Sequence, residues 1–483
     1  MKKNSVVMAI ILLFSLFNFS CSGGRTVCAT SYEINCSLEN DVLSGEEKVV
    51  FYNDSDNSVK QLKFNLFGNA FRKDAKYKPI SEQHEHVAYP SGASYGEMQI
   101  ISVTERGAPL NFSIDGEDKN VLTVELSNEI FPCESVQVEI SFKLKLANVL
   151  ARTGITEKAV NLGNFYPVLC KLTDNGFYEC LYYHNGDPFY SDVANYKVTI
   201  TANEDYVIAS SGKEQSKEYS NGKVKKTFCI NSARSFAMVL STEFKTETAW
   251  CDKTKVNYYY YKDENPKQSI EYAVKSLKYF SNVFGAYPFE EYTVVQTGFV
   301  QGGMEYCSLV YVSDAVEQIS IGEVIVHETA HQWWQVMVGN NEIEHGFLDE
   351  GLAEYSVILF YENHPEYNLT REQLVLSAEK TYKTYCSVYE KLFGSLDTKM
   401  LRSLKDFTSE YEYVNLSYIK PCIMYDCLRK TIGDKKFFDS LKKYFNDYKY
   451  KTATPDDLVG AFEKKGASSN GYFYSFFDGK VVL

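Results

Sequence analysis

The sequence lacks several features that mark large classes of proteins. It has no low-complexity tract and no internal repeat, which argues against disordered and repeat architectures. Its 50 lysines and arginines are outnumbered by 63 aspartates and glutamates, for a formal net charge of -13. The excess of positive charge that nucleic-acid binding needs is therefore missing, and we expect no nucleic-acid partner. A chain of 483 residues is too long for one hydrophobic core and points to two or three domains.

Cysteine pairs at metal-binding spacing are also missing. None of the 12 cysteines forms a C-x-x-C pair, and none lies between Cys307 and Cys386. This argues against a closed structural zinc site in that region, because such sites are usually rich in cysteine. Disulfide pairing cannot be deduced from sequence, and we predict no specific bridge.

The apolar stretch near the N-terminus, residues 6–17, is too short to cross a membrane, which takes about 20 residues. It follows Lys2 and Lys3, an order typical of an export signal over residues 1–20. Cys21 then predicts a bacterial lipoprotein, tethered through a lipid to the outer face of a membrane. Cleavage after Ala29, which would release a secreted protein, is the alternative.

Against this background one short motif stands out, His327-Glu328-Thr329-Ala330-His331. No glycine or proline lies between Glu323 and Val338, and the run is apolar enough to predict a helix. On a helix the two histidines lie one above the other on one face and can hold one zinc ion. Glu328 lies about 100° round the helix and can reach a water molecule on that ion.

A catalytic zinc needs a third protein ligand and an open position. Glu350 follows His331 after 18 residues and lies in a second apolar segment, 347–355, that reads as the start of a helix. We therefore predict one zinc ion per chain, bound by His327, His331 and Glu350. Glu354, one turn further on, is a candidate acceptor for the outer N–H of a zinc-bound histidine.

These motifs resemble the gluzincin aminopeptidase family, of which aminopeptidase N is the best-known member. The H-E-x-x-H motif, the 18-residue spacing and Glu350 match that family, and Gly302-Gly303-Met304-Glu305-Tyr306 is similar to its G-x-M-E-N exopeptidase motif, with Tyr in place of Asn. Tyr418-Ile419-Lys420-Pro421 resembles the family's Tyr-x-Lys-Gly. The likeness is strongest from about residue 284 to residue 428.

The resemblance implies a zinc aminopeptidase that removes N-terminal residues from peptides with a free amine. Glu328 would be the general base, and Tyr418 would stabilise the oxyanion. Glu305 would bind the substrate amine as an exposed carboxylate at a sheet edge. The backbone at Gly302, Gly303 and Met304 would dock the peptide as an added strand.

Residues 30–245 read as a β domain. The segment 136–146 alternates apolar and polar residues as a half-buried strand does, and 122–126 and 196–200 repeat the pattern over shorter stretches. Turn clusters separate these runs and predict antiparallel sheets. The resemblance implies a saddle-like domain here, with 164–167 and 186–189 facing the active site.

Residues 246–483 read as the catalytic domain. Strands are predicted at 256–261 and 292–300, a helix at 270–284, and mainly helices beyond Glu350. The expected fold class is multidomain α+β, with the antiparallel β domain followed by a thermolysin-like, mainly helical catalytic domain. An apolar stripe between Phe437 and Tyr448 is expected to lie in the core of that domain.

Two other functions remain open. The first is a zinc endopeptidase on the same catalytic domain, because Tyr306 departs from the exopeptidase motif. Relatives also place a Gln or Glu from the β domain near the amine, and only Asn161 or Asn164 falls near that place. The second is a surface binding module without activity, which Glu328 argues against, since a site that only binds has no use for a general base.

Overall fold

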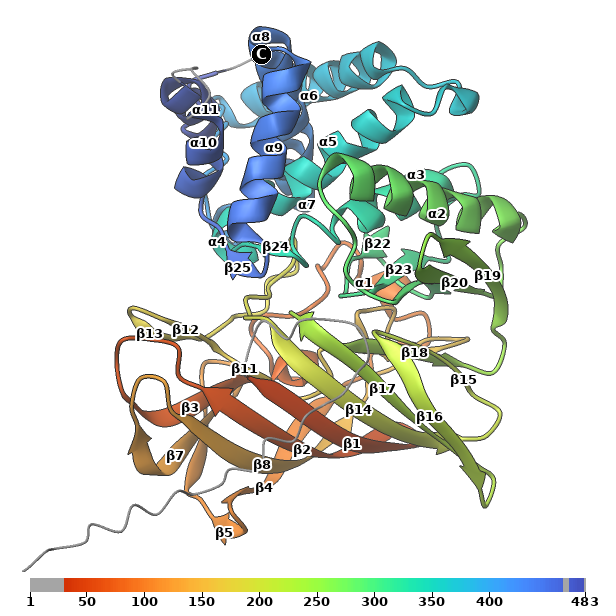
Figure 1. The fold of residues 1–483 in the computed structure, drawn as a ribbon, viewed down its shortest axis with the longest axis vertical. Helices are drawn as coiled ribbons and strands as arrows, with labels where there is room; N and C mark the ends of the chain where they lie inside the picture. The colour runs from red at the N-terminus through yellow and green to blue at the C-terminus, as the bar shows by residue number, and fades with distance from the viewer. Residues whose placement is uncertain (1–29, 464–468, 482–483) are drawn as a thin grey trace, which may run out of the picture.

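The computed structural model describes residues 30–463 and 469–481. The predicted signal segment 1–20, the lipid-anchor candidate Cys21 and the alternative cleavage site at Ala29 lie outside the described residues. Strands predominate as far as Ser241, and helices predominate from Pro266 onward. The helical part sits on one side of the β part, as Figure 1 shows. The predicted multidomain α+β class is therefore confirmed, while the boundary at residue 245 stays a prediction.

The β part is built on one large sheet. Neighbouring strands pair antiparallel, except that β1 and β14 pair parallel at its centre, a long-range pairing that departs from the expected all-antiparallel sheet. In spatial order the strands are β16 (Lys213–Ser220), β17 (Lys223–Ala233), β14 (Ala194–Asn203), β1 (Ser31–Glu39), β2 (Val42–Tyr52), β8 (Ser135–Lys145), β4 (Glu97–Glu105) and β5 (Ala108–Pro109).

The alternation in the sequence explains why these segments form strands. In β8 every second side chain is buried and the others are exposed or half-buried, so the strand predicted at 136–146 is confirmed to within one residue. The strand predicted at 196–200 is confirmed but longer, since it continues in both directions as β14. This alternation gives the sheet one apolar face, which packs in the largest hydrophobic cluster.

Smaller sheets and turns complete the β part. One four-stranded sheet contains β15 (Val207–Ser210), β18 (Ala237–Ser241), β10 (Val160–Gly163) and β9 (Thr153–Ile155). Another contains β11 (Val168–Leu169), β3 (Val59–Asn65), β7 (Val121–Ile130) and β6 (Phe112–Asp115). A hairpin pairs β12 (Lys171–Thr173) with β13 (Gly176–Tyr178), and short helical turns cover Phe67–Phe71 and α1 (Glu85–Ala88).

A five-stranded sheet opens the catalytic part. Its order is β19 (Lys245–Cys251), β20 (Thr254–Tyr260), β21 (Glu291–Thr297), β23 (Leu309–Ser313) and β22 (Gly303–Met304). The strands predicted at 256–261 and 292–300 are confirmed as β20 and β21, although β21 ends earlier. β22 pairs antiparallel with β23 and forms the edge of this sheet.

The helices of the catalytic part are α2 (Pro266–Val283), α3 (Ile321–Ala330), α4 (Glu342–His345), α5 (Phe347–Glu362), α6 (Arg371–Phe393), α7 (Glu410–Val414), α8 (Lys420–Ile432), α9 (Asp434–Tyr448), α10 (Pro455–Glu463) and α11 (Ser469–Phe477). Most of these helices pack in a second hydrophobic cluster, while Ile343 of α4 and Tyr413 of α7 belong to the first. Short 3₁₀ turns cover Pro365–Tyr367 and Leu404–Asp406, and a π-helix covers Asn415–Ile419.

One detail differs from the expectation for this part and another agrees with it. Beyond Glu350 the chain is not helical throughout, because β25 (Lys451–Thr452) pairs with β24 (Val338–Gly339). The stripe on α9 is in the core as predicted, with Phe437, Leu441, Tyr444 and Phe445 buried.

The two parts share apolar packing. The largest hydrophobic cluster runs from the β sheets into Val295, Phe299 and Met304 of the catalytic part. Residues at this junction are held by side chains from both sides, so a site there has rigid walls. Among the residues that the structure describes, no helix combines the length and the apolar character needed to cross a membrane.

Candidate active site

Helix α3 carries the two histidines of the motif. The helix is shorter than predicted, since it ends at Ala330 and the chain then turns through Gln335, at φ 119°, into β24. His331 is the C-cap of the helix and keeps helical backbone angles, and its N–H donates to the carbonyl of His327 at 3.3 Å. The i, i+4 relationship on which the zinc prediction depends is therefore kept.

Three atoms of the predicted ligands converge. The Nε2 atoms of His327 and His331 are 3.1 Å apart, and Oε2 of Glu350 lies 3.3 Å from the first and 3.1 Å from the second. Tetrahedral zinc with ligands at about 2.0–2.1 Å requires separations of about 3.3 Å between them. These residues therefore fit a single zinc ion, with no rearrangement of the backbone.

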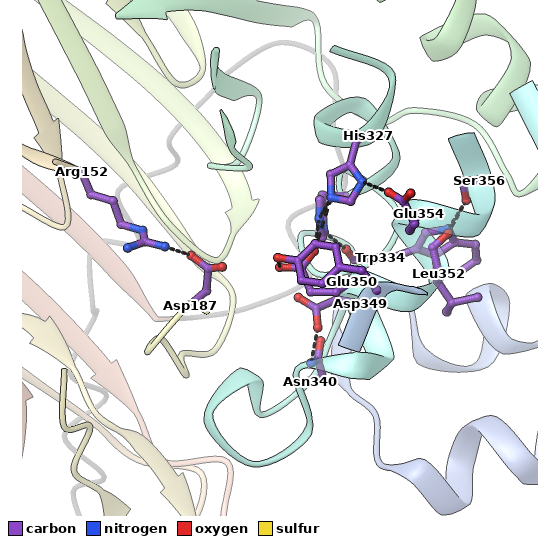
Figure 2. Close-up of polar contacts among 12 residues, drawn as sticks. Arg152, Asp187, His327, Trp334, Asn340, Asp349, Glu350, Leu352, Glu354 and Ser356 are labelled. Atoms are coloured by element: carbon purple, nitrogen blue, oxygen red, sulfur yellow. Dashed lines mark hydrogen bonds and ion pairs between the residues drawn. The ribbon is translucent and has the colours of Figure 1, made fainter. Parts of the chain in front are cut away.

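The other nitrogen of each histidine has a partner. Nδ1 of His327 lies 3.0 Å from Oε2 of Glu354, and Nδ1 of His331 lies 3.0 Å from the carbonyl oxygen of Trp334. These partners favour the tautomer in which Nδ1–H donates and Nε2 is free to bind a metal. The structure thus brings Glu354 to the place expected for it, as Figure 2 shows.

Glu350 is fixed by helix α5. It lies in the first turn of that helix together with Asp349, where the aligned backbone dipoles favour negative charge. Glu350 and Glu354 are one turn apart, so both carboxylates face α3, against which α5 packs.

Glu328 is buried and lies against the edge strand. Its Oε2 has no hydrogen-bond partner among the described residues, and its Oε1 lies so close to Gly303 that a β-carbon there would collide with it. Glycine at position 303 is therefore required for the approach of this carboxylate.

Glu305 differs from the expectation. We predicted an exposed carboxylate at a sheet edge, but the residue directly after β22 is only 3% exposed. The reason is that the β part closes over it, since Phe67, Asn164 and Phe189 line a small cavity together with Glu305. One carboxylate oxygen of Glu305 lies within 4.8 Å of ligand atoms of Glu328 and His331.

Tyr418 comes from the opposite side of the site. It lies in the π-helix that precedes α8, and its hydroxyl donates to Oε1 of Glu350. Its ring stacks on that of His327, with centroids 5.8 Å apart. Pro421, the departure from the family pattern, packs on Gly351, where a β-carbon would lie 2.9 Å from its Cγ.

The two candidates of the β part, Asn161 and Asn164, differ in where their side chains lie. Asn161 is buried and donates to the carbonyls of Ala151 and Gly298, so its amide is committed to the fold. Asn164 lines the cavity beside Glu305. The Tyr306 ring is buried next to Gly163, where a β-carbon would collide with it, so it fills space in the β part.

The structure adds groups that the sequence did not single out. Arg152 and Asp187 form a buried ion pair at 2.5 Å, opposite His327 in Figure 2. Gln335, Glu342 and Asp349 lie near Glu305 in the chain's interior. The position of Asp349 next to a ligand was a usable signal, whereas the others have no pattern in the sequence and come together only through the fold.

Charges in the site are strongly linked. Burial lowers the pKa of the His331 imidazole, but the facing Glu350 outweighs it and raises this pKa to about 10. Burial favours the neutral form of Glu350, and the two imidazoles reverse this and lower its pKa to about 2. Burial raises the pKa of Glu328 to about 7. The space between the three ligand atoms therefore favours positive charge, as a divalent cation would supply.

Comparison with known proteins agrees with this geometry. Residues 268–478 match the peptidase family M1 domain. Aminopeptidase M1-A of Oryza sativa subsp. japonica is 26% identical over 291 residues, which are 56% of this chain and 32% of that protein. Aminopeptidase M1 of Arabidopsis thaliana is 24% identical over 331 residues, 60% of this chain and 36% of that protein. The chain thus spans about a third of the length of the curated relatives it matches.

Solved structures share the fold over nearly the whole chain. A mutant M1 zinc metallopeptidase from Deinococcus radiodurans has a TM-score of 0.66 at 17% identity, over 96% of this chain and 97% of that one. A structure of that mutant bound to a Tyr-Ser-Ala substrate has the same TM-score and identity, over 96% of each chain. Residues 268–478 thus carry a match to the peptidase family M1 domain, in agreement with the gluzincin resemblance of the motifs, and the chain as a whole shares the fold of M1 zinc metallopeptidases.

Proposed function

We propose that the protein is a zinc-dependent aminopeptidase. The observation that carries this proposal is the convergence of His327, His331 and Glu350 on one point, with the buried carboxylates of Glu328 and Glu305 beside it. The first three would hold one zinc ion per chain. When bound, zinc would polarise the scissile carbonyl and lower the pKa of a water molecule.

Glu328 has the position of a general base. It lies one residue after a metal ligand, it is buried, and it has an oxygen without a partner. A raised pKa suits a carboxylate that must take a proton from the attacking water and give it to the leaving amine.

Tyr418 is the proposed oxyanion donor. Its hydroxyl already reaches the ligand Glu350, and burial beside that carboxylate raises the pKa of the phenol, so that it stays protonated. A protonated phenol can donate a hydrogen bond to the oxygen on which negative charge develops.

Glu305 is the proposed partner of the substrate's free amine. A peptide ammonium that enters a buried cavity loses its hydration, and only a charged partner can compensate for that loss. The free edge of β22 offers backbone groups at Gly303 and Met304 on which the peptide could pair as an added strand. Gly302, just before the strand, would give the backbone room for this approach.

The endopeptidase alternative is less favoured by the geometry. An endopeptidase needs room for substrate on both sides of the scissile bond, whereas Glu305 lies in a small cavity lined by Phe67 and Phe189. The curated relatives are also named as aminopeptidases. A binding module without activity would not need Glu328 beside the metal ligands.

The proposal is tested with zinc analysis and hydrolysis of an aminoacyl-coumarin. Purified wild type should hold one zinc per chain and release coumarin, and a chelator should abolish the release. Glu328→Gln should keep the zinc and lose several powers of ten in turnover, whereas His331→Ala should lose the metal. Near-normal turnover of Glu328→Gln would show that another group is the base.

We also propose export and anchoring through Cys21, with cleavage near Ala29 as the alternative. The support is the order of basic residues, apolar stretch and cysteine in the sequence. Cells grown with a clickable fatty acid should label the wild type but not Cys21→Ala. An unlabelled wild type would favour cleavage near Ala29.

A further inference from the structure

A second group of carboxylates lies beyond the zinc ligands. Glu305 follows β22, Glu342 begins α4 and Asp349 lies in the first turn of α5. One oxygen from each lies within 4.8 Å of the others, and the three residues are only 2–3% exposed. Three carboxylates this close cannot all be charged in a buried site without a cation.

Arg234 is the cation that lines the cavity with Glu305 and Gln335, but its guanidinium donates to the carbonyls of Ser191 and Lys451 and not to a carboxylate. In the described ranges, no lysine, arginine or histidine forms an ion pair with Glu305, Glu342 or Asp349. The Gln335 side chain forms a hydrogen bond with Glu342, and Nδ2 of Asn340 donates to Oδ1 of Asp349 at 2.8 Å. Figure 2 shows this pair below Glu350.

Three buried acceptors at this place have no partner. They are Oε1 of Glu305, Oε2 of Glu342 and Oε1 of Gln335, and none accepts a hydrogen bond from any described residue. Gln335 is not acidic, so its orphaned oxygen is an observation independent of the carboxylates. It is 8% exposed and lines the same cavity as Glu305. Buried acceptors are normally satisfied, and three together point to a missing donor.

The cavity sets the size of that donor. It has a volume of about 20 Å³, which is room for one group of the size of a water molecule. The –NH₃⁺ end of a peptide has this size, and it offers three N–H donors and one positive charge.

We propose that Gln335 and Glu342 act with Glu305 as one three-acceptor recess that binds the N-terminal ammonium of the substrate. The inference rests on the proposed aminopeptidase function and deepens it, because it names two further substrate-binding residues. The recess would also replace the Gln or Glu that relatives place near the amine from the β part. Asn161 cannot take that role, because its amide donates to the carbonyls of Ala151 and Gly298.

Two other occupants are possible outcomes of the test. Oxygen ligands alone suit a hard divalent cation such as Ca²⁺ or Mg²⁺, and a single water molecule would satisfy part of the group. The ammonium is favoured because Glu305 also lies within 4.8 Å of the catalytic carboxylate Glu328, so an amine held there lies beside the reacting centre.

The test compares L-leucinamide with N-acetyl-L-leucinamide as competitive inhibitors of coumarin release. The two probes share a side chain and differ in the ammonium. Glu342→Gln should raise the inhibition constant of leucinamide by about 10-fold or more, the usual effect of losing a hydrogen bond to a charged group. The inhibition constant of the acetylated probe should not change. Gln335→Met, which keeps the length of the side chain, should act in the same direction, with a rise in KM larger than the fall in kcat.

The matched control is Glu344→Gln on the same helix, whose side chain accepts from the Tyr178 hydroxyl at 2.9 Å, away from the recess. It should change neither inhibition constant. Melting curves and zinc content should be the same for all four proteins.

Each failure has its own signature. If leucinamide inhibits the wild type more strongly and the variants do not change this difference, the proposed role of the recess is wrong and the aminopeptidase function stands. The recess would then hold only water. A second divalent ion per wild-type chain that Glu342→Gln loses would make it a metal site. Equal inhibition of the wild type by both probes would defeat the aminopeptidase function and the recess together.

Discussion

The carboxylate of Glu328 lies directly against the backbone of Gly303, with no room for a β-carbon between them. This contact joins the zinc helix α3 to the edge strand β22, so the proposed base and the proposed docking strand are fixed by one packing relationship. Gly303→Ala should push Glu328 out of place and lower kcat by about 10²-fold, since a shift of about 1 Å has that cost. Zinc content should stay at the wild-type level.

Gly302→Ala provides the comparison for this variant. A β-carbon at position 302 meets nothing within 4 Å, so the loss of activity should be much smaller than for Gly303→Ala. Equal losses in the two variants would show that the effect comes from the flexibility of the strand and not from the position of Glu328.

Tyr418→Phe tests the oxyanion donor. The ring should keep its place against the ring of His327, because the stacking does not involve the hydroxyl. Turnover should fall by about 10²–10³-fold, the usual cost of one lost donor, while KM and zinc content stay nearly constant. Steady-state kinetics measures this, and a fully active variant would mean that another group stabilises the oxyanion.

A buried carboxyl far from the site should make stability depend on pH. Glu47 in β2 is 1% exposed and has no partner for either oxygen among the described residues. Burial raises the pKa of Glu47 well above its ordinary 4.5. The folded state therefore keeps this proton while the unfolded state loses it, so the free energy of unfolding falls as pH rises above about 4.5.

Glu47→Gln removes this dependence. Its melting temperature should exceed that of the wild type at pH 8 by more than at pH 5, with about 2–4 °C for each kcal/mol in a domain of roughly 200 residues. Glu46→Gln, on the exposed face of the same strand, should show no such trend. A constant difference across pH for Glu47→Gln would mean that the Glu47 carboxyl is charged in the fold.

Local patterns predicted the parts of this molecule that depend on neighbours in sequence. The alternation in β8 and the i, i+4 spacing of His327 and His331 each depend on one element alone, so both are found in the structure as predicted. The spacing to Glu350 also worked, because it carries over from a family with the same two helices. The length of α3 was wrong, since the turn at Gln335 depends on the pairing of β24 with β25.

Contacts between distant segments could not be predicted in this way. The parallel pairing of β1 with β14 joins strands about 160 residues apart, and no local pattern encodes it. Glu305 was expected to be exposed because the edge strand alone would leave it so, and only the β part buries it. Gln335 and Glu342 carry no motif, and their unsatisfied oxygens became visible only in three dimensions.

The most direct test of the central claim is the wild-type kcat/KM for one short peptide with a free N-terminus and for the same peptide N-acetylated, at equal zinc content. A site built around a buried ammonium partner should reject the acetylated peptide by about 10⁴-fold, because Glu305 would be left without its cation. Equal rates on the two peptides would contradict the aminopeptidase account and leave a zinc endopeptidase in its place.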